Sequence, residues 1–583
     1  MNTQRIQSLI TRARNGMAYL LRGDLRGFQR RWRALRQEKM QVAPRTHAAE
    51  SILPGTLLRW CVMATPHTLF IAHLIARRLR EHGWSVKVVT QEPEAYNDHF
   101  YVVICPQMFR TLPPPERRFL YQMEQSVSSR WFTDEYLHNL QHSRAILDYA
   151  LVNFEFLETK DIAFPHTHYL PVGADPHYGD DLPAQEKVHD VLFYGDAASS
   201  PRRRRLLEAL EKHFKVHRCS EIFGDEMRRE IQRARLVVNL HYYENALLEM
   251  PRVQECLSLG VPVVSESAQD QDDYPEIQGA LRFFPEGDAE AMVAAVRQAL
   301  DEPIPAAQVR EAAQKGWERF CFMFDRFLVA TQLLLPARML NNPLPLPADA
   351  SRLVLSLPET IRRRRAYDAR PLAEGMTFDG MRYSPGWIGC GLSYGAMARH
   401  VLRHRDPDAA PPVLIIEDDA ELPPDFEQKI GIIQAYLQAR PGEWDVFAGL
   451  VADLQPDAQV LKVETFQGLQ FVTIDKMTST VCNIYSRRGL ELLAAWDPAE
   501  GDAHTNTIDR YLGEHCAPLR VVVVLPFLAS LREELDSTLW GIGNRRYLDM
   551  IADSERRLGL KIDAFLQGKP QPLTPSLTFP ESS

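Results

Sequence analysis

Residues 235–266 read RLVVNLHYYENALLEMPRVQECLSLGVPVVSE, a strand, a helix and a second strand in succession. The outer segments, 235–243 and 261–266, are apolar runs typical of buried strands. The segment between them, 250–260, places apolar residues at helical spacing and ends at Gly260, a favoured helix terminator. Strands that alternate with helices of this length predict a parallel sheet with helices on both faces.

The alternation continues toward the N-terminus in two series. The series leading into residues 235–266 has expected strands at 190–195 and 215–219 and expected helices at 202–214 and 224–234. An earlier series has expected strands at 57–65, 84–90 and 100–109 and an expected helix at 69–83. Two successive series predict two doubly wound α/β domains that face one another.

A third α/β series follows a proline-rich stretch. Residues 341–351, NNPLPLPADAS, lack periodicity and predict a linker, and the next strand is expected at 352–357. The predicted units are a basic helical extension at 1–50, α/β domains at 51–185, 186–340 and 352–545, the linker at 341–351, and a helix with a flexible tail at 546–583. Few contacts are expected across the linker, because domain boundaries usually fall where contacts are sparse.

The composition is that of a globular protein and argues against several classes. The chain has 583 residues, of which 45% are hydrophobic and 25% charged, and its net charge of -9 argues against a dedicated nucleic-acid-binding protein. Its eight cysteines lack CxxC spacing, so neither a zinc finger nor a disulfide framework is indicated, and reduced thiols in the cytoplasm are expected. No apolar run approaches the ~20 residues of a membrane-spanning helix.

The N-terminal extension is strongly basic. Residues 1–50 contain eleven Lys or Arg against three Asp or Glu, and apolar side chains recur at helical spacing. Such a helix can lie on the anionic inner face of the cytoplasmic membrane as a peripheral contact. It can equally pack against the next domain with its arginines solvated, and both alternatives stay open.

In the third domain a buried strand ends on three carboxylates. Residues 413–426 read VLIIEDDAELPPDF, in which four apolar residues run into Glu417, Asp418 and Asp419. Like charges this close repel, so a cation is expected beside them. Oxygen ligands at the carboxyl end of a strand suit Mg²⁺ or Mn²⁺. The alternative is an acidic loop that caps the helix near Phe426.

An ordered set of motifs around this strand resembles glycosyltransferase family 25, which includes bacterial lipopolysaccharide and collagen galactosyltransferases. The set comprises LVLSLPETIRRRR at 353–365, an Asp-Gly pair at 379–380, GWIGCGLS at 386–393 and the EDD at 417–419. The resemblance spans about residues 351–530. It implies a GT-A fold, a nucleotide-sugar donor such as UDP-galactose, and inversion at the anomeric carbon with Mn²⁺ or Mg²⁺. The chain departs from the family at Trp387 and Tyr394, where Glu and His are usual.

The resemblance also implies roles for single residues of this domain. Glu417, Asp418 and Asp419 would hold the metal. Asp509, in HTNTIDRYL, would be the general base that takes the proton of the acceptor hydroxyl, with Asp502 as the reserve candidate.

Four consecutive arginines, residues 362–365, follow the first strand of the third domain at an expected helix start. Arg362 and Arg365 are candidates for holding the donor diphosphate, helped by free backbone N–H groups. The alternative is that at least two of the four arginines face water.

Residues 234–266 resemble the donor-side domain of GT-B glycosyltransferases, particularly the family-4-like group. The EAxAxGxPVV segment of that group corresponds to residues 255–264, and the group's glutamate that hydrogen-bonds the nucleotide ribose corresponds to Glu255. The second glutamate of the group would fall on Leu247, so Glu249 is its candidate substitute, and Arg252 would meet a phosphate.

The resemblance extends to the expected phosphate side of that domain. The turn at Gly195 is similar to the phosphate-side loop of the group, where glycine lets the backbone approach the diphosphate. No metal is expected here, because helix dipoles and basic residues take up the leaving charge in GT-B enzymes.

Together these features predict a two-module glycosyltransferase, a hexosyltransferase using nucleotide-sugar and in particular UDP-sugar donors. A GT-B-like pair of Rossmann domains would be followed by a GT-A-like module, and the bifunctional chain would extend a bacterial surface glycan of lipopolysaccharide or capsule type. One alternative is a single active family-25-like module on a non-catalytic GT-B scaffold. Others are a carbohydrate-binding scaffold with both sites inactive, and a transferase acting on protein or nucleic acid.

Overall fold

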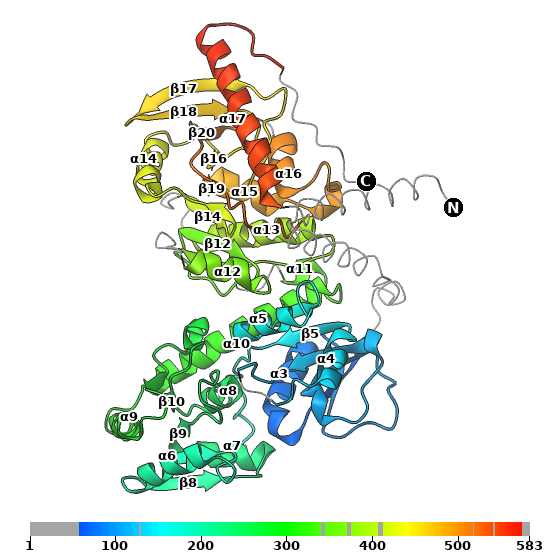
Figure 1. Cartoon of the computed structure of the whole chain (residues 1–583), viewed down its shortest axis with the longest axis vertical. Coiled ribbons are helices and arrows are strands. Elements are labelled where there is room, and N and C mark those ends of the chain that lie inside the picture. The colour runs from blue at the N-terminus through cyan, green and yellow to red at the C-terminus, as the bar shows by residue number, and fades with distance from the viewer. Residues whose placement is uncertain are drawn as a thin grey trace, which may run out of the picture.

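The computed structural model describes residues 57–127, 130–339, 344–369, 375–405, 412–516, 518–539 and 543–573. The predicted basic extension at 1–50 lies outside these ranges, and so does the tail beyond residue 573. Figure 1 shows two α/β domains side by side, with a third α/β domain stacked on them along the longest axis.

The first domain is built on a parallel sheet of six strands in the order β2-β1-β3-β4-β5-β6. Its strands are β1 (Arg59–Met63), β2 (Ser85–Val89), β3 (Phe100–Ile104), β4 (Arg118–Gln122), β5 (Ala145–Asp148) and β6 (Thr167–Tyr169). Its helices are α3 (Leu69–Glu81), α4 (Asp134–Gln141) and α5 (Leu151–Thr159). Strands β3 and β4 are buried along their whole length, as expected of a sheet covered on both faces.

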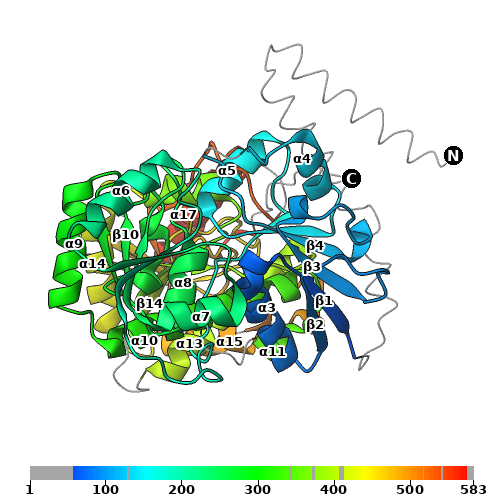
Figure 2. The same ribbon diagram turned by 90° about the horizontal axis from the view of Figure 1, so that it is seen from below.

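The second domain has a parallel sheet of five strands in the order β11-β10-β9-β7-β8. The strands are β7 (His189–Tyr194), β8 (Val216–Cys219), β9 (Ala234–Asn239), β10 (Val263–Glu266) and β11 (Leu281–Phe284), and the helices are α6 (Pro201–Glu211), α7 (Gly224–Gln232), α8 (Met250–Ser258) and α9 (Ala289–Asp301). The predicted strand–helix–strand unit at 235–266 is therefore confirmed as β9, α8 and β10. Figure 2 separates the first sheet from the helices of the second domain.

One long helix returns from the second domain to the first. Helix α10 (Ala306–Ala330) contacts α8 and, through Arg319, the carboxylate of Glu276 at 2.7 Å. Its second half packs on the first domain, where Phe327 meets the ring of Phe119 edge-on and Asp325 pairs with Arg78. The short helix α11 (Pro336–Met339) follows it. The chain thus crosses back over both domains before it enters the third.

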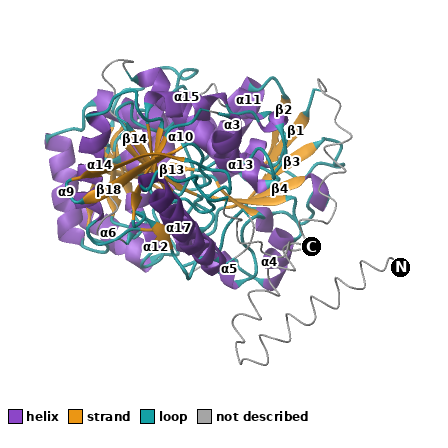
Figure 3. Cartoon of the chain, turned by 90° about the horizontal axis from the view of Figure 1, so that it is seen from above, coloured by secondary structure: helices purple, strands orange, loops and turns teal. Residues whose placement is uncertain are grey.

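The third domain has a mixed sheet of eight strands in the order β13-β12-β14-β19-β16-β20-β18-β17. The strands are β12 (Arg352–Ser356), β13 (Met376–Asp379), β14 (Val413–Glu417), β16 (Val446–Ala448), β17 (Val460–Phe466), β18 (Leu469–Ile474), β19 (Cys482–Tyr485) and β20 (Val521–Leu525), and a small sheet pairs β15 (Ala420–Glu421) with β21 (Ser530–Leu531). The helices are α12 (Ile361–Asp368), α13 (Gly386–His404), α14 (Phe426–Gln438), α15 (Arg487–Ala495), α16 (Ile508–His515) and α17 (Asn544–Leu566). Figure 3 labels α12, α13, α14, α15 and α17 of this domain around its orange strands.

Glu359 joins the first domain, helix α10 and the third domain at a buried point. Its carboxylate accepts hydrogen bonds from both terminal nitrogens of Arg326 on α10, at 2.6 and 2.8 Å, and from the backbone N–H of Tyr169 at 3.0 Å. Arg382 of the third domain lies 3.2 Å from the same carboxylate and donates to the backbone oxygen of Thr167. Burial opposes ionisation, but Arg326 and Arg382 outweigh it and hold the pKa of Glu359 well below its usual value.

This contact corrects the expectation that few contacts cross the linker. The described part of the linker packs as well, because Leu346 is buried and the backbone oxygen of Pro347 lies 3.1 Å from the ring of His400 on α13. Separation of the two modules would break the hydrogen bonds between Glu359 and Arg326 and would expose apolar contacts such as that between Phe322 and Phe378 to water. The two halves are therefore not expected to separate as independent soluble pieces.

We predict that Glu359→Gln destabilises the full chain by about 3–5 kcal/mol, because two guanidinium groups lose the carboxylate that compensates them in a buried place. A folded-state pKa below the unfolded value means that the stabilisation is complete above about pH 4.3 and is lost as the pH falls. Urea unfolding midpoints at pH 7.5 and pH 4 measure both effects.

Glu427→Gln is the matched control. Glu427 forms a two-point pair with Arg352, at 2.7 and 2.9 Å, but its side chain is 47% exposed. An exposed pair contributes about 1 kcal/mol or less. Equal shifts of the unfolding midpoint in the two variants would contradict the central role of Glu359.

Candidate functional site

The carboxyl ends of β7 and β9 carry a cluster of basic groups. Gly195 directly follows β7 with φ of +127°, a conformation that favours glycine. A Cβ at this position would lie 3.0 Å from Nη2 of Arg252 and 3.7 Å from Nη1 of Arg203. The absence of a side chain at Gly195 therefore lets the backbone approach two guanidinium groups closely. In open α/β sheets this end of the strands is where ligands bind.

Glu249 holds the two arginines in place. It accepts from Nη2 of Arg203, on α6, at 2.7 Å and from Nη1 of Arg252, on α8. Arg252 also donates to the side chain of Asn239, the last residue of β9, at 2.5 Å. Burial works to raise the pKa of Glu249, but Arg252 and Arg203 prevail and lower it. The cluster of two arginines and one glutamate retains one positive charge.

Two side chains of this region have buried nitrogens without a hydrogen-bond partner among the described residues. They are Nε of Arg252 and both ring nitrogens of His241, whose side chain is fully buried. Burial lowers the pKa of His241, so its ring is neutral and can both donate and accept. Buried polar groups are rarely left unpaired in proteins, so these nitrogens are suited to meeting a ligand.

Glu255 lies on the next turn of α8. Its carboxylate accepts from the hydroxyl of Tyr194 at 3.2 Å. Burial raises the pKa of Glu255 to about 7, although Tyr194 and Arg252 oppose the shift. The structure thus brings together Gly195, Glu249, Arg252 and Glu255, the four donor-site residues that the sequence predicts for this domain.

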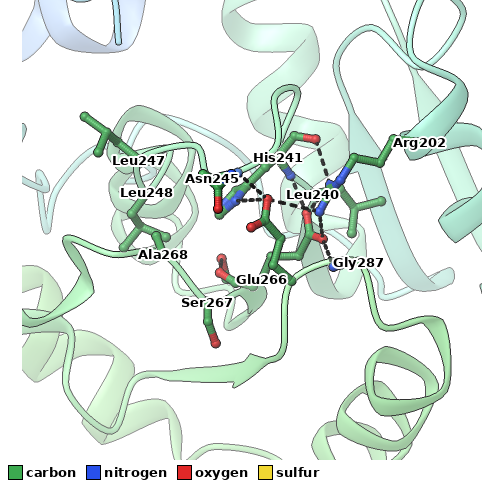
Figure 4. A network of polar contacts seen from close by, with 12 residues as sticks. Arg202, Leu240, His241, Asn245, Leu247, Leu248, Glu266, Ser267, Ala268 and Gly287 are labelled. Atoms are coloured by element: carbon green, nitrogen blue, oxygen red, sulfur yellow. Dashed lines mark hydrogen bonds and ion pairs between the residues drawn. The ribbon is translucent and has the colours of Figure 1, made fainter. Parts of the chain in front are cut away.

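A second buried carboxylate keeps the strand ends together. Figure 4 shows Glu266, the last residue of β10, between Arg202, His241 and Gly287. Glu266 accepts from Arg202, from the backbone N–H of His241 at 2.6 Å and from that of Gly287 at 2.8 Å. Arg202 is therefore engaged in holding the loops, and Arg203, its neighbour on α6, faces the cluster.

Sequence reasoning missed His241 as a site residue and did not separate Arg203 from the three arginines beside it, to which the phosphate argument applied only weakly. Arg203 is the second of four arginines that begin α6, and only the helix phase distinguishes it from the exposed Arg204 and Arg205. His241 lies two residues beyond the end of β9, and this place just after an apolar strand was the signal that the sequence offered.

In the third domain the cation beside the three carboxylates is an arginine. Strand β14 ends at Glu417 as predicted, and Asp418 and Asp419 follow it in buried positions. Arg363 of α12 lies 2.5 Å from Oδ1 of Asp418 and 3.1 Å from Oδ2 of Asp419. Asp418 also accepts from Ser356 at 2.8 Å. The guanidinium supplies the positive charge that the sequence led us to expect from a metal ion.

Glu417 accepts hydrogen bonds from side chains other than Arg363. It accepts from the hydroxyl of Tyr394 at 2.9 Å and from that of Thr480 at 2.7 Å. Burial and the charge of Asp419 raise the pKa of Glu417 to about 7. Burial also raises the pKa of Asp419, with Arg363 opposing the shift and Asp418 adding to it. Tyr394, which departs from the family pattern, thus has a defined role as a donor to Glu417.

The predicted metal set of Glu417, Asp418 and Asp419 does not fit one ion in this arrangement. Among the described residues, these three do not form a group whose ligand atoms all lie within 4.8 Å of one another. Asp418 is fully occupied by Arg363 and Ser356, whereas Oδ1 of Asp419 is buried without a partner. Asp419 is the member of the triplet that could still accept a divalent ion.

Asp509 lies on the same side of the domain as Asp419. It stands in the first turn of α16 and accepts from Thr507 at 2.7 Å. Asp419 and Asp509 both act on the Tyr547 hydroxyl, whose pKa is raised by burial first and then by these charges. Both carboxylates therefore act electrostatically on the region around Tyr547.

Asp502 lies in a turn. Its carboxylate is exposed and accepts from the backbone N–H groups of His504 and Thr505, at 2.9 and 3.1 Å. Its role as the reserve base stays a prediction.

Arg362 and Arg365 are corrected from donor ligands to contacts between domains. The side chain of Arg362 is 71% exposed and pairs with Glu158 of the first domain at 2.8 Å. Arg365 makes a two-point pair with Asp273 of the second domain, at 3.1 and 3.0 Å. Both side chains leave α12 on the side that faces the other domains, because helix phase separates them from Arg363.

We predict that Arg363→Met destabilises the full chain by about 3–5 kcal/mol, because Asp418 and Asp419 lose their compensating charge. Burial already raises the pKa of Asp419 in the folded parent, and without the guanidinium this pKa rises further, so the loss grows as the pH rises from 5 to 8. Urea unfolding at the two pH values measures it. Arg362→Met is the control, and a loss of equal size there, or a loss independent of pH, would contradict the assignment.

Comparison with protein families assigns the donor-side cluster to a glycosyltransferase. Residues 184–321 match the model of a family described as glycosyl transferase-like. The match contains every residue of the cluster from Gly195 to Glu266 and confirms the prediction that the chain is a glycosyltransferase. It ends before the third domain, so the likeness of that domain to family 25 stays a prediction.

Solved structures with similarity to the chain cover about half of it. They include a sucrose-phosphate synthase from Thermosynechococcus elongatus (13% identity, 46% of this chain and 95% of that chain, TM-score 0.30) and Anabaena HepE in complex with UDP and glucose (11% identity, 48% and 100%, TM-score 0.33). A third is WaaG, a glycosyltransferase involved in lipopolysaccharide biosynthesis (12% identity, 45% and 95%, TM-score 0.31). At these identities and TM-scores the likenesses do not bear on donor or acceptor. No curated protein matches the chain.

Proposed function

We propose that the first two domains transfer a sugar from a nucleotide-sugar donor bound at the carboxyl ends of β7 and β9. The observation that carries this proposal is the gathering of Gly195, Arg203, Arg252 and Glu255 within the segment that matches the glycosyltransferase family. A site with surplus positive charge, a close backbone approach and unpaired buried nitrogens suits a diphosphate.

Each residue of the cluster has a part in this proposal. Arg203 and Arg252 pair with the diphosphate, and the backbone at Gly195 approaches it. Glu249 orients both guanidinium groups without cancelling their charge. Glu255 accepts a hydrogen bond from a ribose hydroxyl, the role that the GT-B resemblance implies for it.

The chemical step follows from this placement. The bond between the anomeric carbon and the diphosphate oxygen breaks, a bond to the acceptor oxygen forms, and the departing diphosphate oxygen takes up the proton of the acceptor hydroxyl. The charge that develops on the leaving diphosphate is stabilised by Arg203 and Arg252. In this proposal these groups supply the positive charge that a metal ion supplies elsewhere, and the module uses no metal.

A second transferase site in the third domain is the further part of the proposal. It is supported by Glu417 and Asp419, carboxyl groups with raised pKa values at a strand end, and by Asp509 near them. Asp509 would act as the base for the acceptor hydroxyl, and Asp419 would face the donor. A Mn²⁺ or Mg²⁺ ion at Asp419 would offset the charge of a leaving diphosphate. Inversion and UDP-galactose remain what the family-25 resemblance implies.

The acceptor proposed for both sites is a growing surface glycan or glycolipid, as the family-25 resemblance implies. A cytoplasmic chain with its basic residues 1–50 at the inner membrane face would meet such an acceptor. None of the described helices combines the length and the hydropathy that crossing a bilayer requires. An acceptor screen that includes oligosaccharides, glycolipids, proteins and nucleic acids separates this proposal from its alternatives.

We predict that Glu255→Gln weakens UDP binding to the full chain at pH 8 by about 1–3 kcal/mol, the range for a lost hydrogen bond to a buried polar group. With a pKa of about 7, Glu255 is mostly protonated at pH 6 and mostly ionised at pH 8. The ratio of parent to variant affinity should therefore grow about tenfold between these pH values. Calorimetry with UDP, GDP and CMP measures it, and ionisation of the nucleotide phosphate cancels in the ratio.

Glu244→Gln, at an exposed glutamate of the same domain, is the control and should bind like the parent at both pH values. A parent that binds a nucleotide with an affinity unchanged by Glu255→Gln would remove Glu255 from the site. A parent that binds none of the three nucleotides would contradict the proposed donor class.

Variants of the full chain test the second site. If the third domain is a transferase, Asp419→Asn and Asp509→Asn each abolish one donor turnover that Glu255→Gln leaves intact, and Asp502→Asn changes neither. If its chemistry needs an ion, EDTA removes the same turnover and Mn²⁺ restores it. If the single substitution Glu255→Gln removes every donor turnover of the chain, the third domain is not a transferase.

A further inference from the structure

The amino end of the second sheet carries a group of three side chains from three elements. His189 is the first residue of β7, His217 is the second residue of β8, and Glu230 lies in the last turn of α7. One possible ligand atom from each residue lies within 4.8 Å of the other two, and this is the sole group of that kind in the described part of the chain.

The distances suit a metal ion better than a hydrogen bond. Oε2 of Glu230 lies 3.6 Å from Nε2 of His189 and 3.3 Å from Nε2 of His217. Both exceed the usual 2.7–3.2 Å of an N–H···O bond. Bonds of about 2.0–2.1 Å to a tetrahedral Zn²⁺ place neighbouring ligand atoms about 3.3–3.4 Å apart. The observed separations are close to the edges of such a tetrahedron.

The two imidazole rings stack in parallel, with centroids 4.1 Å apart and an interplanar angle of 6°. An imidazole nitrogen binds a metal in the plane of its ring, so one ring turns out of the stack when both nitrogens bind the same ion. Arg233 donates to Oε1 of Glu230 at 2.8 Å, which orients the carboxylate and leaves Oε2 to the histidines. Oε2 is itself buried and has no hydrogen-bond partner among the described residues. Support of a ligating carboxylate by a neighbouring donor is typical of metal sites.

We propose that His189, His217 and Glu230 form a binding site for a divalent transition metal, with Zn²⁺ as the preferred ion. Two imidazole nitrogens and one carboxylate oxygen are a ligand set of the kind that zinc prefers over Mg²⁺ or Ca²⁺. The side chains are 14%, 38% and 16% exposed, so an ion can enter from solvent and a water can complete the coordination.

This site is separate from the proposed donor site. His189 begins β7, and Tyr194 ends it next to Gly195, about 16 Å further along the strand. In Figure 1, β8 and α7 lie at the end of the molecule away from the third domain. An ion here would tie β7, β8 and α7 together and would have no part in the proposed transfer.

Metal titration of the full chain, purified without a polyhistidine tag and freed of metal, tests the proposal. We expect one equivalent of Co²⁺ to bind with the visible absorption of a four-coordinate site, and Zn²⁺ to displace it. Zn²⁺ should also raise the unfolding midpoint, because it binds the folded chain. His217→Gln and Glu230→Gln should each weaken binding at least ~10-fold, remove the absorption and abolish the Zn²⁺-dependent rise.

His213→Gln and His177→Gln are the matched controls. His213 is an exposed histidine of the same domain, and His177 forms an exposed pair with Asp180 at 2.8 Å but has no second histidine beside it. Both should bind like the parent. Circular dichroism and the metal-free unfolding midpoint confirm that each variant is folded. Parent-like binding in a folded His217→Gln or Glu230→Gln, or no saturable one-equivalent binding by the parent, would overturn the proposal.

Discussion

The buried carboxylate of Glu359 is the point on which the arrangement of the three domains depends. It is fully buried and receives Arg326 from the return helix, Arg382 from the third domain and a backbone N–H from the first domain. Removing a charge from water is favourable only when its partners are also in place. The ion pair therefore forms only when all the surrounding elements are docked, and it makes the relative position of the domains specific.

Helix α10 carries this constraint into the proposed donor site. It contacts α8, the helix that bears Arg252 and Glu255, and its other half packs on the first domain. The donor cluster thus lies on a helix braced by the same element that bears Arg326. A change at the domain interface can therefore reach the donor cluster through the packing of α10 against α8, although no interface residue belongs to the cluster.

The two candidate sites use charge in opposite ways. In the second domain two arginines surround one glutamate, which leaves a positive surplus suited to phosphate. In the third domain Arg363 pairs with two of three successive carboxylates, which leaves a negative surplus and carboxyl groups with raised pKa values. The first pattern favours binding of an anion, and the second favours proton transfer or a cation.

The sequence by itself determined the α/β class, the strand–helix–strand unit at 235–266 and the triple carboxylate at the end of β14, because hydrophobic periodicity and strand ends are local properties. It also predicted Gly195, Arg252 and Glu255 as donor-site residues through the GT-B resemblance, and their role stays a prediction. Only the tertiary structure decided the partners of Arg362, Arg363 and Arg365. Within one helix turn these three arginines point in different directions, so they pair with the first, third and second domain respectively. It alone also placed His189, His217 and Glu230 together, because their meeting depends on packing between elements that the sequence separates.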